Sequence, residues 1–299
     1  MSAAGNGLNE RVPKVAVERS FACLEAPPCD ICGAPACSAP WGADVCTGCG
    51  SVSASTLPSV EELRTFYAKF NVEYSGGGRQ RGAADRQIRY ARAYLALVRR
   101  FRQRGRLIDI GPSTNPFPNY AAEAGYQVTV VDYMRPVGLD PRIEFVQGTA
   151  EARPELSSRF DVVTAFAMIE HCSDPGEAAA ALASCCVSGS IVLVMTPLVG
   201  DFFERNAPGR TRWFCPPEHL HLVSRAGMQR LFQTAGCNLV HCRRFELNGI
   251  RWAARYGLAA AEGVAGMALR RVVPGLWRGS RNKRFALGQQ MALYVFRKT

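Results

Sequence analysis

The sequence predicts an α/β protein in which a doubly wound sheet follows a small cysteine-rich module. Three observations predict this arrangement. The segment 106–132 has the pattern of a strand, a turn-rich loop, a short helix and a second strand that ends on a carboxylate. Further apolar, β-branched runs follow it and alternate with helical segments. Two Cys-x-x-Cys pairs stand in front of it, at 29–32 and 46–49.

The strand–loop–helix–strand unit is the centre of the prediction. Residues 107–110 are apolar and largely β-branched, as in a buried strand, and Gly111 opens a turn-rich loop. A helical segment then ends at Gly125, and the apolar run 128–131 leads to Asp132. In doubly wound sheets, backbone N–H groups of the first loop hold a ligand, and an acid about 20 residues further on accepts its ribose hydroxyls. The unit therefore predicts a nucleotide-type ligand between Gly111 and Asp132.

Two other interpretations of this unit stay open. A plain dinucleotide-binding domain would carry Gly-x-Gly-x-x-Gly after the first strand, and the loop here has Pro112, Pro116 and Pro118 instead of such a run. A βαβ unit that only holds structure, with no ligand, is the second alternative.

Composition narrows the class of protein. A chain of 299 residues with 47% hydrophobic residues has room for one large domain plus a small module. The net charge of +11 comes almost entirely from arginines scattered along the chain, so we do not expect nucleic acid as the main partner. The sequence has no run of about 18 uncharged apolar residues, and its polar first residues lack the pattern of a signal peptide. We therefore expect a cytoplasmic protein.

The cysteines indicate a metal. In a reducing compartment, the four thiolates of Cys29, Cys32, Cys46 and Cys49 have the spacing of a structural zinc site. Two disulfides or four free thiols are the alternatives, and Cys37, between the pairs, could replace one ligand. A closed shell of four sulfurs leaves no open position, so the zinc should hold structure and take no part in chemistry.

These features suggest a division of the chain. Residues 1–22 are polar and lack periodicity, so we expect a flexible N-terminus, then a zinc-binding module at 23–57 and a larger domain at 58–299. A glycine triplet at 76–78 lacks the Gly-Lys-Ser/Thr of a phosphate-binding loop. We interpret it as a mobile flap that brings Tyr74 to the mouth of the ligand site; a plain linker is the alternative.

Further elements are expected on both sides of the central unit. A helix at 58–70 has Leu63, Phe66 and Tyr67 on one apolar face. The expected later strands are 143–146, 160–166, 190–197, 238–245 and 290–297.

At two of its motifs the chain resembles the class I S-adenosylmethionine (SAM)-dependent methyltransferases. Their first motif is Asp-x-Gly-x-Gly-x-Gly; Asp109 and Gly111 match it, while Ser113 and Asn115 stand where the next glycines are usual. Both of these residue types suit tight turns. The second motif follows the strand at 160–166: Ile-Glu-His, then Asp-Pro, as in the small-molecule methyltransferases of this class.

The resemblance implies a Rossmann-like, seven-stranded, mostly parallel sheet with helices on both faces and a reversed last hairpin. It also implies SAM as the cofactor. The usual Asp that takes the adenine amino group is replaced by Thr149, so backbone groups or Glu151 would take over this contact. The residues expected to bind the cofactor are Asp109, Gly111, Ser113, Asp132, Thr149, Ala150, Phe166 and Tyr74.

The same resemblance places the acceptor of the methyl group at the loop 198–222. Within it, Glu218-His219 resembles the family's Glu-His entry into the next helix. His219 is the first candidate for the general base, because the pKa of an imidazole lies near neutrality. His171 and Glu218 are further catalytic candidates; histidines that only brace the loop are the alternative.

An insertion at 248–286 carries a wide apolar surface and a cluster of basic residues. It would pack on the core, cover the acceptor as a lid, or make a peripheral membrane contact.

A zinc module in front of such a domain resembles the sugar C-methyltransferases of antibiotic pathways. Those proteins usually carry a further C-terminal domain that this length does not hold. We therefore expect methyl transfer to a small-molecule acceptor of sugar, natural-product or envelope-glycolipid type. An RNA base methyltransferase with an N-terminal zinc module is an alternative, although its ligands usually include a His near the second pair, and none stands there. A catalytically degenerate SAM-binding scaffold is another. The sequence predicts no oligomeric state.

Overall fold

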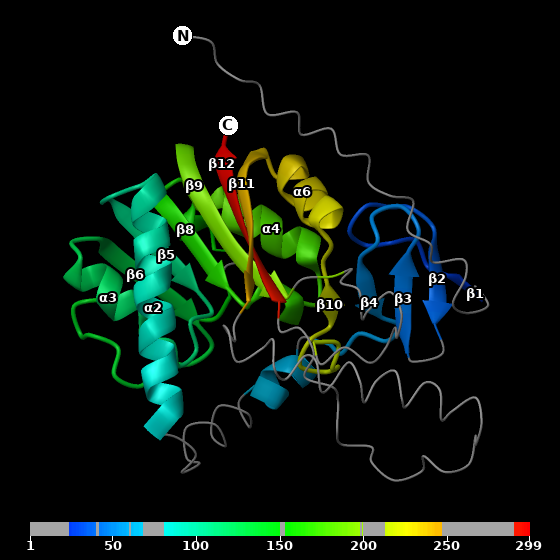
Figure 1. Cartoon of the computed structure of the whole chain (residues 1–299), viewed down its shortest axis with the longest axis horizontal. Coiled ribbons are helices and arrows are strands. Elements are labelled where there is room, and N and C mark those ends of the chain that lie inside the picture. Colours follow the sequence, from blue (N-terminus) through cyan, green and yellow to red (C-terminus); the bar gives the residue numbers. More distant parts are fainter. Residues whose placement is uncertain are drawn as a thin grey trace.

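The computed structural model describes residues 24–39, 42–59, 61–67, 81–149, 153–197, 199, 213–246 and 290–299. The expected N-terminal tail, Tyr74, the glycine triplet, Ala150, most of the acceptor loop and the 248–286 insertion lie outside these residues. Within them, the strands form a seven-stranded sheet and a separate five-stranded sheet (Figure 1).

The larger sheet has the order β11-β12-β9-β8-β5-β6-β7. Its strands are β5 (Arg106–Ile110), β6 (Gln127–Asp132), β7 (Glu144–Gln147), β8 (Phe160–Phe166), β9 (Cys186–Pro197), β11 (Cys237–Glu246) and β12 (Gln290–Lys298). Neighbours from β9 to β7 run parallel, whereas β12 is antiparallel to both β9 and β11. The expected seven-stranded sheet with a reversed last hairpin is confirmed.

The strand order changes direction at β5. The chain continues from β5 to β6 on one side, and later returns to place β8 on the other side. Crevices at the carboxyl ends of strands beside such a switch point are where doubly wound sheets bind ligands. The fold thus singles out the edge formed by the ends of β5, β6 and β8.

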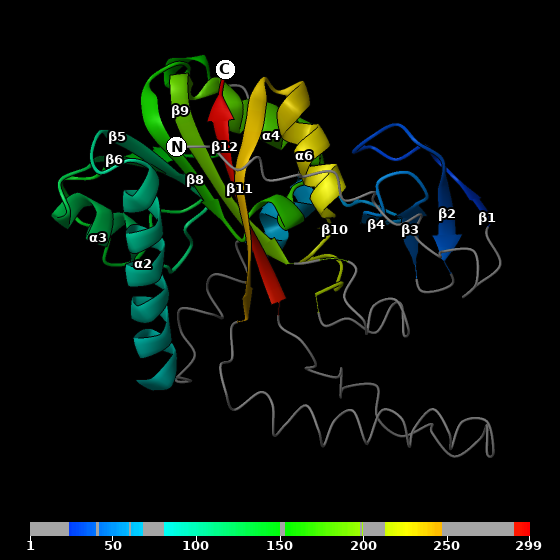
Figure 2. The same ribbon diagram turned by 45° about the horizontal axis from the view of Figure 1, so that its top comes forward.

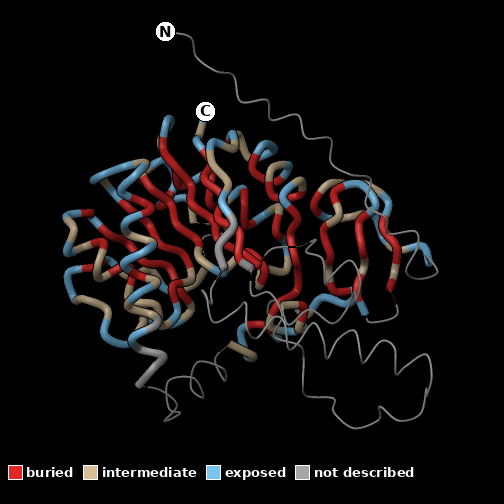
Figure 3. Tube along the Cα trace, in the orientation of Figure 1, coloured by how far each residue is buried: buried red, intermediate tan, exposed pale blue. Residues whose placement is uncertain are grey.

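Helices cover both faces of this sheet. They are α2 (Arg81–Phe101), α3 (Phe117–Glu123), α4 (Pro175–Ser184) and α6 (Arg225–Thr234). Successive strand residues alternate between faces: Leu107 and Val162 pack with α2 and α3, while Ile108 and Val163 pack with α4 and α6. Figure 2 shows the two helix pairs on separate sides of the sheet, and Figure 3 shows that its central strands are largely buried.

The smaller sheet contains the cysteine-rich module. Its strands are β1 (Leu24–Ala26), β2 (Ala36–Ala39), β3 (Ala43–Cys46), β4 (Val52–Ala54) and β10 (His221–Leu222), in that order. The last strand comes from the segment that the sequence assigns to the acceptor loop, and both views place it between the module and α6 (Figures 1 and 2). No helix among the described residues is long and apolar enough to cross a membrane.

Candidate active site

A cavity of about 350 Å³ opens at the carboxyl ends of β5, β6 and β7. This volume falls within the range of small-molecule sites. Its walls include Leu63, Tyr67, Ile110, Gly111, Val131, Asp132, Tyr133, Gly148, Thr149, Met168, His171, Cys172, Ser173, Asp174, Glu177 and Ala178.

The loop after β5 needs its glycine. Gly111 has φ of +69°, and a Cβ there would lie 3.1 Å from Cγ of Met168. Its N–H donates to the carbonyl of Val131 at 2.9 Å, which ties the loop to β6. Ser113, at a usual glycine position, also has a positive φ, of 51°. Position 113 therefore accommodates serine in place of glycine, and the backbone keeps a tight turn beside the cavity.

Asp132 ends β6 in the cavity wall. Its Oδ2 accepts a hydrogen bond from the N–H of Ser113 at 2.9 Å. Burial raises the pKa of this carboxyl group, and backbone N–H groups of Ser113, Met134 and Tyr133 oppose that rise. The carboxylate is thus held in place by the backbone of its own loop and of the loop after β5.

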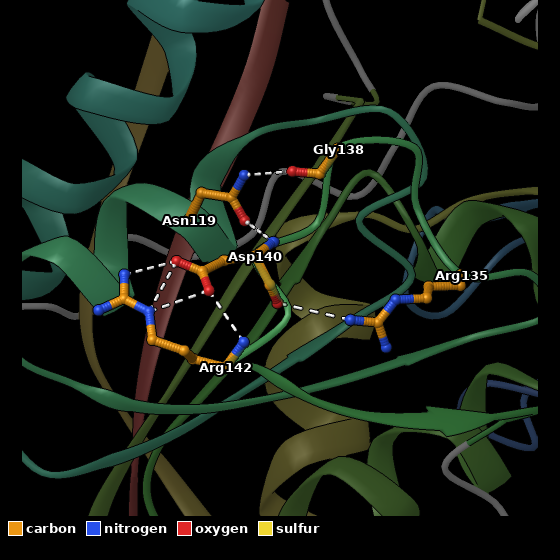
Figure 4. Close-up of polar contacts among 5 residues, drawn as sticks. All are labelled: Asn119, Arg135, Gly138, Asp140 and Arg142. Atoms are coloured by element: carbon orange, nitrogen blue, oxygen red, sulfur yellow. Dashed lines mark hydrogen bonds and ion pairs between the residues drawn. The ribbon is translucent and has the colours of Figure 1, made fainter.

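The loop after Asp132 is held by polar contacts of its own (Figure 4). Asn119 donates to the carbonyl of Gly138 at 2.8 Å and accepts from the N–H of Asp140 at 3.0 Å. The Arg142 guanidinium pairs with Asp140 and lowers the pKa of that carboxyl to about 2. These contacts anchor the far end of a loop whose near end forms the cavity wall.

Asp109 lies below the cavity rather than in its wall. It is 2% exposed, and the hydroxyl of Thr164 donates to its Oδ1 at 2.7 Å. Burial raises its pKa to about 7, with a smaller contribution from the charge of Asp132. Asp109 therefore supports the end of β5 from within the sheet.

The other cofactor candidates are divided. Thr149 lines the cavity, whereas Phe166 packs against Tyr94 and Phe117 on the α2–α3 side of the sheet.

His171 faces the cavity from η3 (Ile169–His171), the short helix after β8. Its Nδ1 lies 2.6 Å from the carbonyl of Glu218 and 2.8 Å from the hydroxyl of Tyr67, which also donates to that carbonyl at 3.1 Å. The carbonyl of Ala167 is a further hydrogen-bonding neighbour. Burial lowers the pKa of His171 to about 3, with a contribution from His219. A neutral ring between two carbonyls is well placed to brace this wall of the site.

His219 lies behind His171, with ring centroids 4.7 Å apart, and is 7% exposed. Its Nδ1 lies 2.6 Å from the carbonyl of Trp213, which only accepts, so this nitrogen carries the proton. Burial lowers the pKa of His219, which keeps the ring neutral and leaves Nε2 as a lone-pair acceptor. Glu218 contributes its carbonyl to the site, while its carboxylate lies 3.8 Å from the sulfur of Cys215.

Two residues beside His171, Tyr67 in the cavity wall and Glu170 behind it, are absent from the candidates that the sequence suggests. Tyr67 reads only as part of an apolar helix face. Glu170 is fully buried and accepts from Thr196 at 3.0 Å, and its other oxygen has no hydrogen-bond partner among the described residues. Burial raises its pKa to about 8. Its position inside the Ile-Glu-His motif is the signal that points to it.

Glu170, His171 and His219 place one ligand atom each within 4.8 Å of one another. A set of two imidazoles and a carboxyl group suits either proton transfer or a divalent cation.

The four predicted zinc ligands come together in the smaller sheet. The sulfurs of Cys29 and Cys49 are 3.9 Å apart, and those of Cys32 and Cys46 are 3.4 Å apart. A tetrahedral zinc with bonds of about 2.3 Å needs sulfurs roughly 3.8 Å apart, so the set fits this metal. Two backbone N–H groups point at the sulfur of Cys46, as expected for a thiolate. Cys37 is disulfide-bonded and does not belong to this set.

The profile of a methyltransferase domain family matches residues 83–242 of the chain. No curated protein sequence matches the chain significantly. Many solved structures match the fold, including a methyltransferase and a cyclase. A 1,6-didemethyltoxoflavin-N1-methyltransferase from Burkholderia thailandensis, solved with 1,6-didemethyltoxoflavin and S-adenosylhomocysteine, superposes with a TM-score of 0.53 at 16% identity, covering 83% of this chain and 96% of that one. The [4+2]-cyclase SpnF superposes with a TM-score of 0.51 at 18% identity, covering 81% and 97%.

Proposed function

This chain belongs to the methyltransferase domain family, and from that premise we propose that it transfers the methyl group of SAM to a small-molecule acceptor. One observation carries the proposal. The cavity at the switch point of the sheet combines a glycine turn, at Gly111, with the carboxylate of Asp132. Such sheets hold a nucleoside with two parts. One is a glycine turn that has no room for a Cβ, and the other is an acid at the end of the second strand.

SAM, when bound, supplies a methyl group that its sulfonium charge already activates, so the protein mainly has to align donor and acceptor. In this proposal the backbone beside Gly111 and the carboxylate of Asp132 bind the nucleoside. His219 takes the proton of the acceptor on Nε2, since its Nδ1 proton is held by the carbonyl of Trp213. His171 and Tyr67 keep the segment around Glu218 closed against the cavity.

The acceptor class in the proposal is a sugar, a natural product or an envelope glycolipid. The Burkholderia neighbour, whose acceptor is a small molecule, supports this choice by analogy. One of the structural neighbours is a cyclase, so the same fold is found with a different reaction. The experiment must therefore distinguish a methyltransferase from a catalytically degenerate SAM-binding scaffold.

Calorimetry with S-adenosylhomocysteine, followed by transfer of labelled methyl groups into a small-molecule panel, tests the proposal. Micromolar binding together with labelled product is the expected result. Binding without transfer to any class of acceptor would favour the scaffold, and a tight, salt-sensitive RNA complex that becomes labelled would favour the RNA enzyme. No binding of the nucleoside would overturn the proposal.

We further propose that Cys29, Cys32, Cys46 and Cys49 bind one structural zinc ion. Mass spectrometry of the metal should find one zinc per chain, lost in Cys46→Ser. A second equivalent that disappears in Glu170→Gln would instead assign a metal to the set of Glu170, His171 and His219.

A further inference from the structure

The acceptor-side segment leaves the cavity directly into the cysteine-rich module. After His219, the carbonyl of Leu220 accepts from the N–H of Ala54 at 2.8 Å, and His221 and Leu222 then pair with Ser53 and Val52 as β10. The segment that carries the proposed base therefore continues, two residues later, into an edge strand of the module's sheet. A shift of β4 would have only two residues of chain to cross before it reached His219.

One side chain makes a second link between the module and the cavity. His221 is fully buried; its Nδ1 lies 2.9 Å from the hydroxyl of Ser53, and its Nε2 lies 3.3 Å from the carbonyl of Ser173 in the cavity wall. A neutral imidazole satisfies both partners, because Nδ1 accepts from the hydroxyl and Nε2 donates to the carbonyl. The ring thus joins β4 to the residue that precedes Asp174, the N-cap of α4.

The thiol cluster is joined to the large domain at another point. The hydroxyl of Ser224, the N-cap of α6, donates to the carbonyl of Cys49 at 2.6 Å, and its N–H donates to Ser51 at 3.0 Å. The sulfur of Cys49 lies 3.2 Å from that same Ser51 hydroxyl. Ile31, Cys46 and Cys49 also pack in one core with α6. The module therefore shares a hydrophobic core with the larger domain and does not form a separate unit.

We propose that the zinc module positions the acceptor side of the methyl-transfer site, and that His221 is the positioning residue that couples the two. The proposal rests on the proposed function in one respect, that the cavity binds the SAM nucleoside. By thermodynamic linkage, a ligand that holds the cavity wall must then also hold the zinc. Bound nucleoside then raises the affinity for zinc, and removal of zinc weakens nucleoside binding by the same factor. A higher zinc affinity is expected to appear as slower loss of zinc.

The experiment uses the full-length chain and measures the transfer of zinc to a coloured chelator, with and without S-adenosylhomocysteine. We expect the nucleoside to slow zinc loss about 5-fold or more in the wild type, which is the lower end of usual coupling strengths when the coupling acts on the dissociation of zinc. In His221→Ala the ratio of the two rates should fall to about 1, whatever happens to the absolute rates. His221→Gln retains an amide N–H for the carbonyl of Ser173 and should restore part of the ratio.

His241→Ala is the matched control, because His241 lies on β11 against Phe101, on the opposite side of the sheet from the module. Its ratio should equal that of the wild type. Ser53→Ala, which removes only the hydroxyl partner of His221, should lower the ratio as well, and it carries the test if His221→Ala does not fold.

The outcomes separate the two proposals. If calorimetry shows no binding of S-adenosylhomocysteine, the proposed function fails. If the nucleoside binds but leaves zinc loss unchanged in the wild type, or if His221→Ala keeps the full ratio, the coupling is overturned while the function stands. A chain that contains no zinc also overturns the coupling.

Discussion

The two sides of the cavity are built in different ways. The nucleoside side comes from one stretch of chain: Gly111, Ser113 and Asp132 belong to consecutive elements and are tied by backbone hydrogen bonds. The acceptor side is assembled from distant segments, since Tyr67 and His171 meet at the carbonyl of Glu218. Under the proposed function, binding of the donor depends on local backbone geometry, and handling of the acceptor depends on tertiary contacts.

The largest effect is expected on the nucleoside side. Asp132→Ala removes the carboxylate and leaves the N–H of Ser113 without its partner, so affinity for S-adenosylhomocysteine should fall about 100-fold or more. Calorimetry measures this change. Asp140→Ala, which removes a half-buried acid paired with Arg142 at the other end of the same loop, should stay close to the wild-type affinity. Equal losses of affinity in both variants would mean that binding depends on an ordered conformation of the loop and not on the carboxylate of Asp132.

The next effect belongs to the acceptor side. His219→Ala should lower kcat about 100-fold with little change in nucleoside affinity, because it removes only the proton acceptor. His171→Ala should instead affect nucleoside affinity and kcat together, since this ring lies in the cavity wall and braces Glu218. Steady-state kinetics and calorimetry on both variants make the comparison. A His219→Ala enzyme with wild-type turnover would remove this residue from the chemistry.

A smaller effect is expected on stability, at the contact between the cysteine-rich module and α6. A Cβ on Gly227 would overlap the hydroxyl of Ser51 and press on Ile31. Gly227→Ala should therefore lower the free energy of unfolding by roughly 1–3 kcal/mol through overpacking at the contact between module and α6. Denaturant titration gives this value. If the variant is as stable as wild type, the module is able to move relative to α6, and the close packing described above has little energetic weight.

The last effect is a pH dependence of stability on the nucleoside side. Burial raises the pKa of Asp109 to about 7, above its unfolded value, so the folded state holds this proton more tightly. The corresponding stability is present below about pH 4 and is lost as pH rises toward 7, with a slope of at most about 1.4 kcal/mol per pH unit. In Asp109→Asn this decline should be absent from the unfolding free energy measured between pH 4 and 7. The same slope in both proteins would assign the decline to other groups, Glu170 first, whose pKa is also raised.

The same contrast explains what the sequence could predict. The strand, turn and acid of 106–132 and the two cysteine pairs are local patterns, and their geometry follows from residue types at fixed spacing. Ser113 shows that the pattern tolerates a replaced glycine when the backbone is tied elsewhere. The resemblance to known methyltransferases supplied the strand order, which periodicity alone does not contain.

The acceptor side was less accessible to prediction for a physical reason. Tyr67 is indistinguishable from a core residue on its helix until the fold brings it to His171. Glu218 contacts Tyr67 and His171 through its backbone carbonyl, and a pattern of side-chain types does not predict a backbone contact. His221 reads as one more loop histidine, and its partners Ser53 and Ser173 come from two other parts of the chain.

The pairing of β10 with β4 has a consequence for how the protein is made. Ser53 of β4 and His221 of β10 are in contact although they lie 168 positions apart in the chain. The ribosome therefore synthesises β4 long before β10. During translation the nascent module displays an open strand edge, the kind that invites pairing with a foreign chain. Early capture of the proposed zinc ion would order the module around that edge, so we expect cells starved of zinc to accumulate this polypeptide in aggregates.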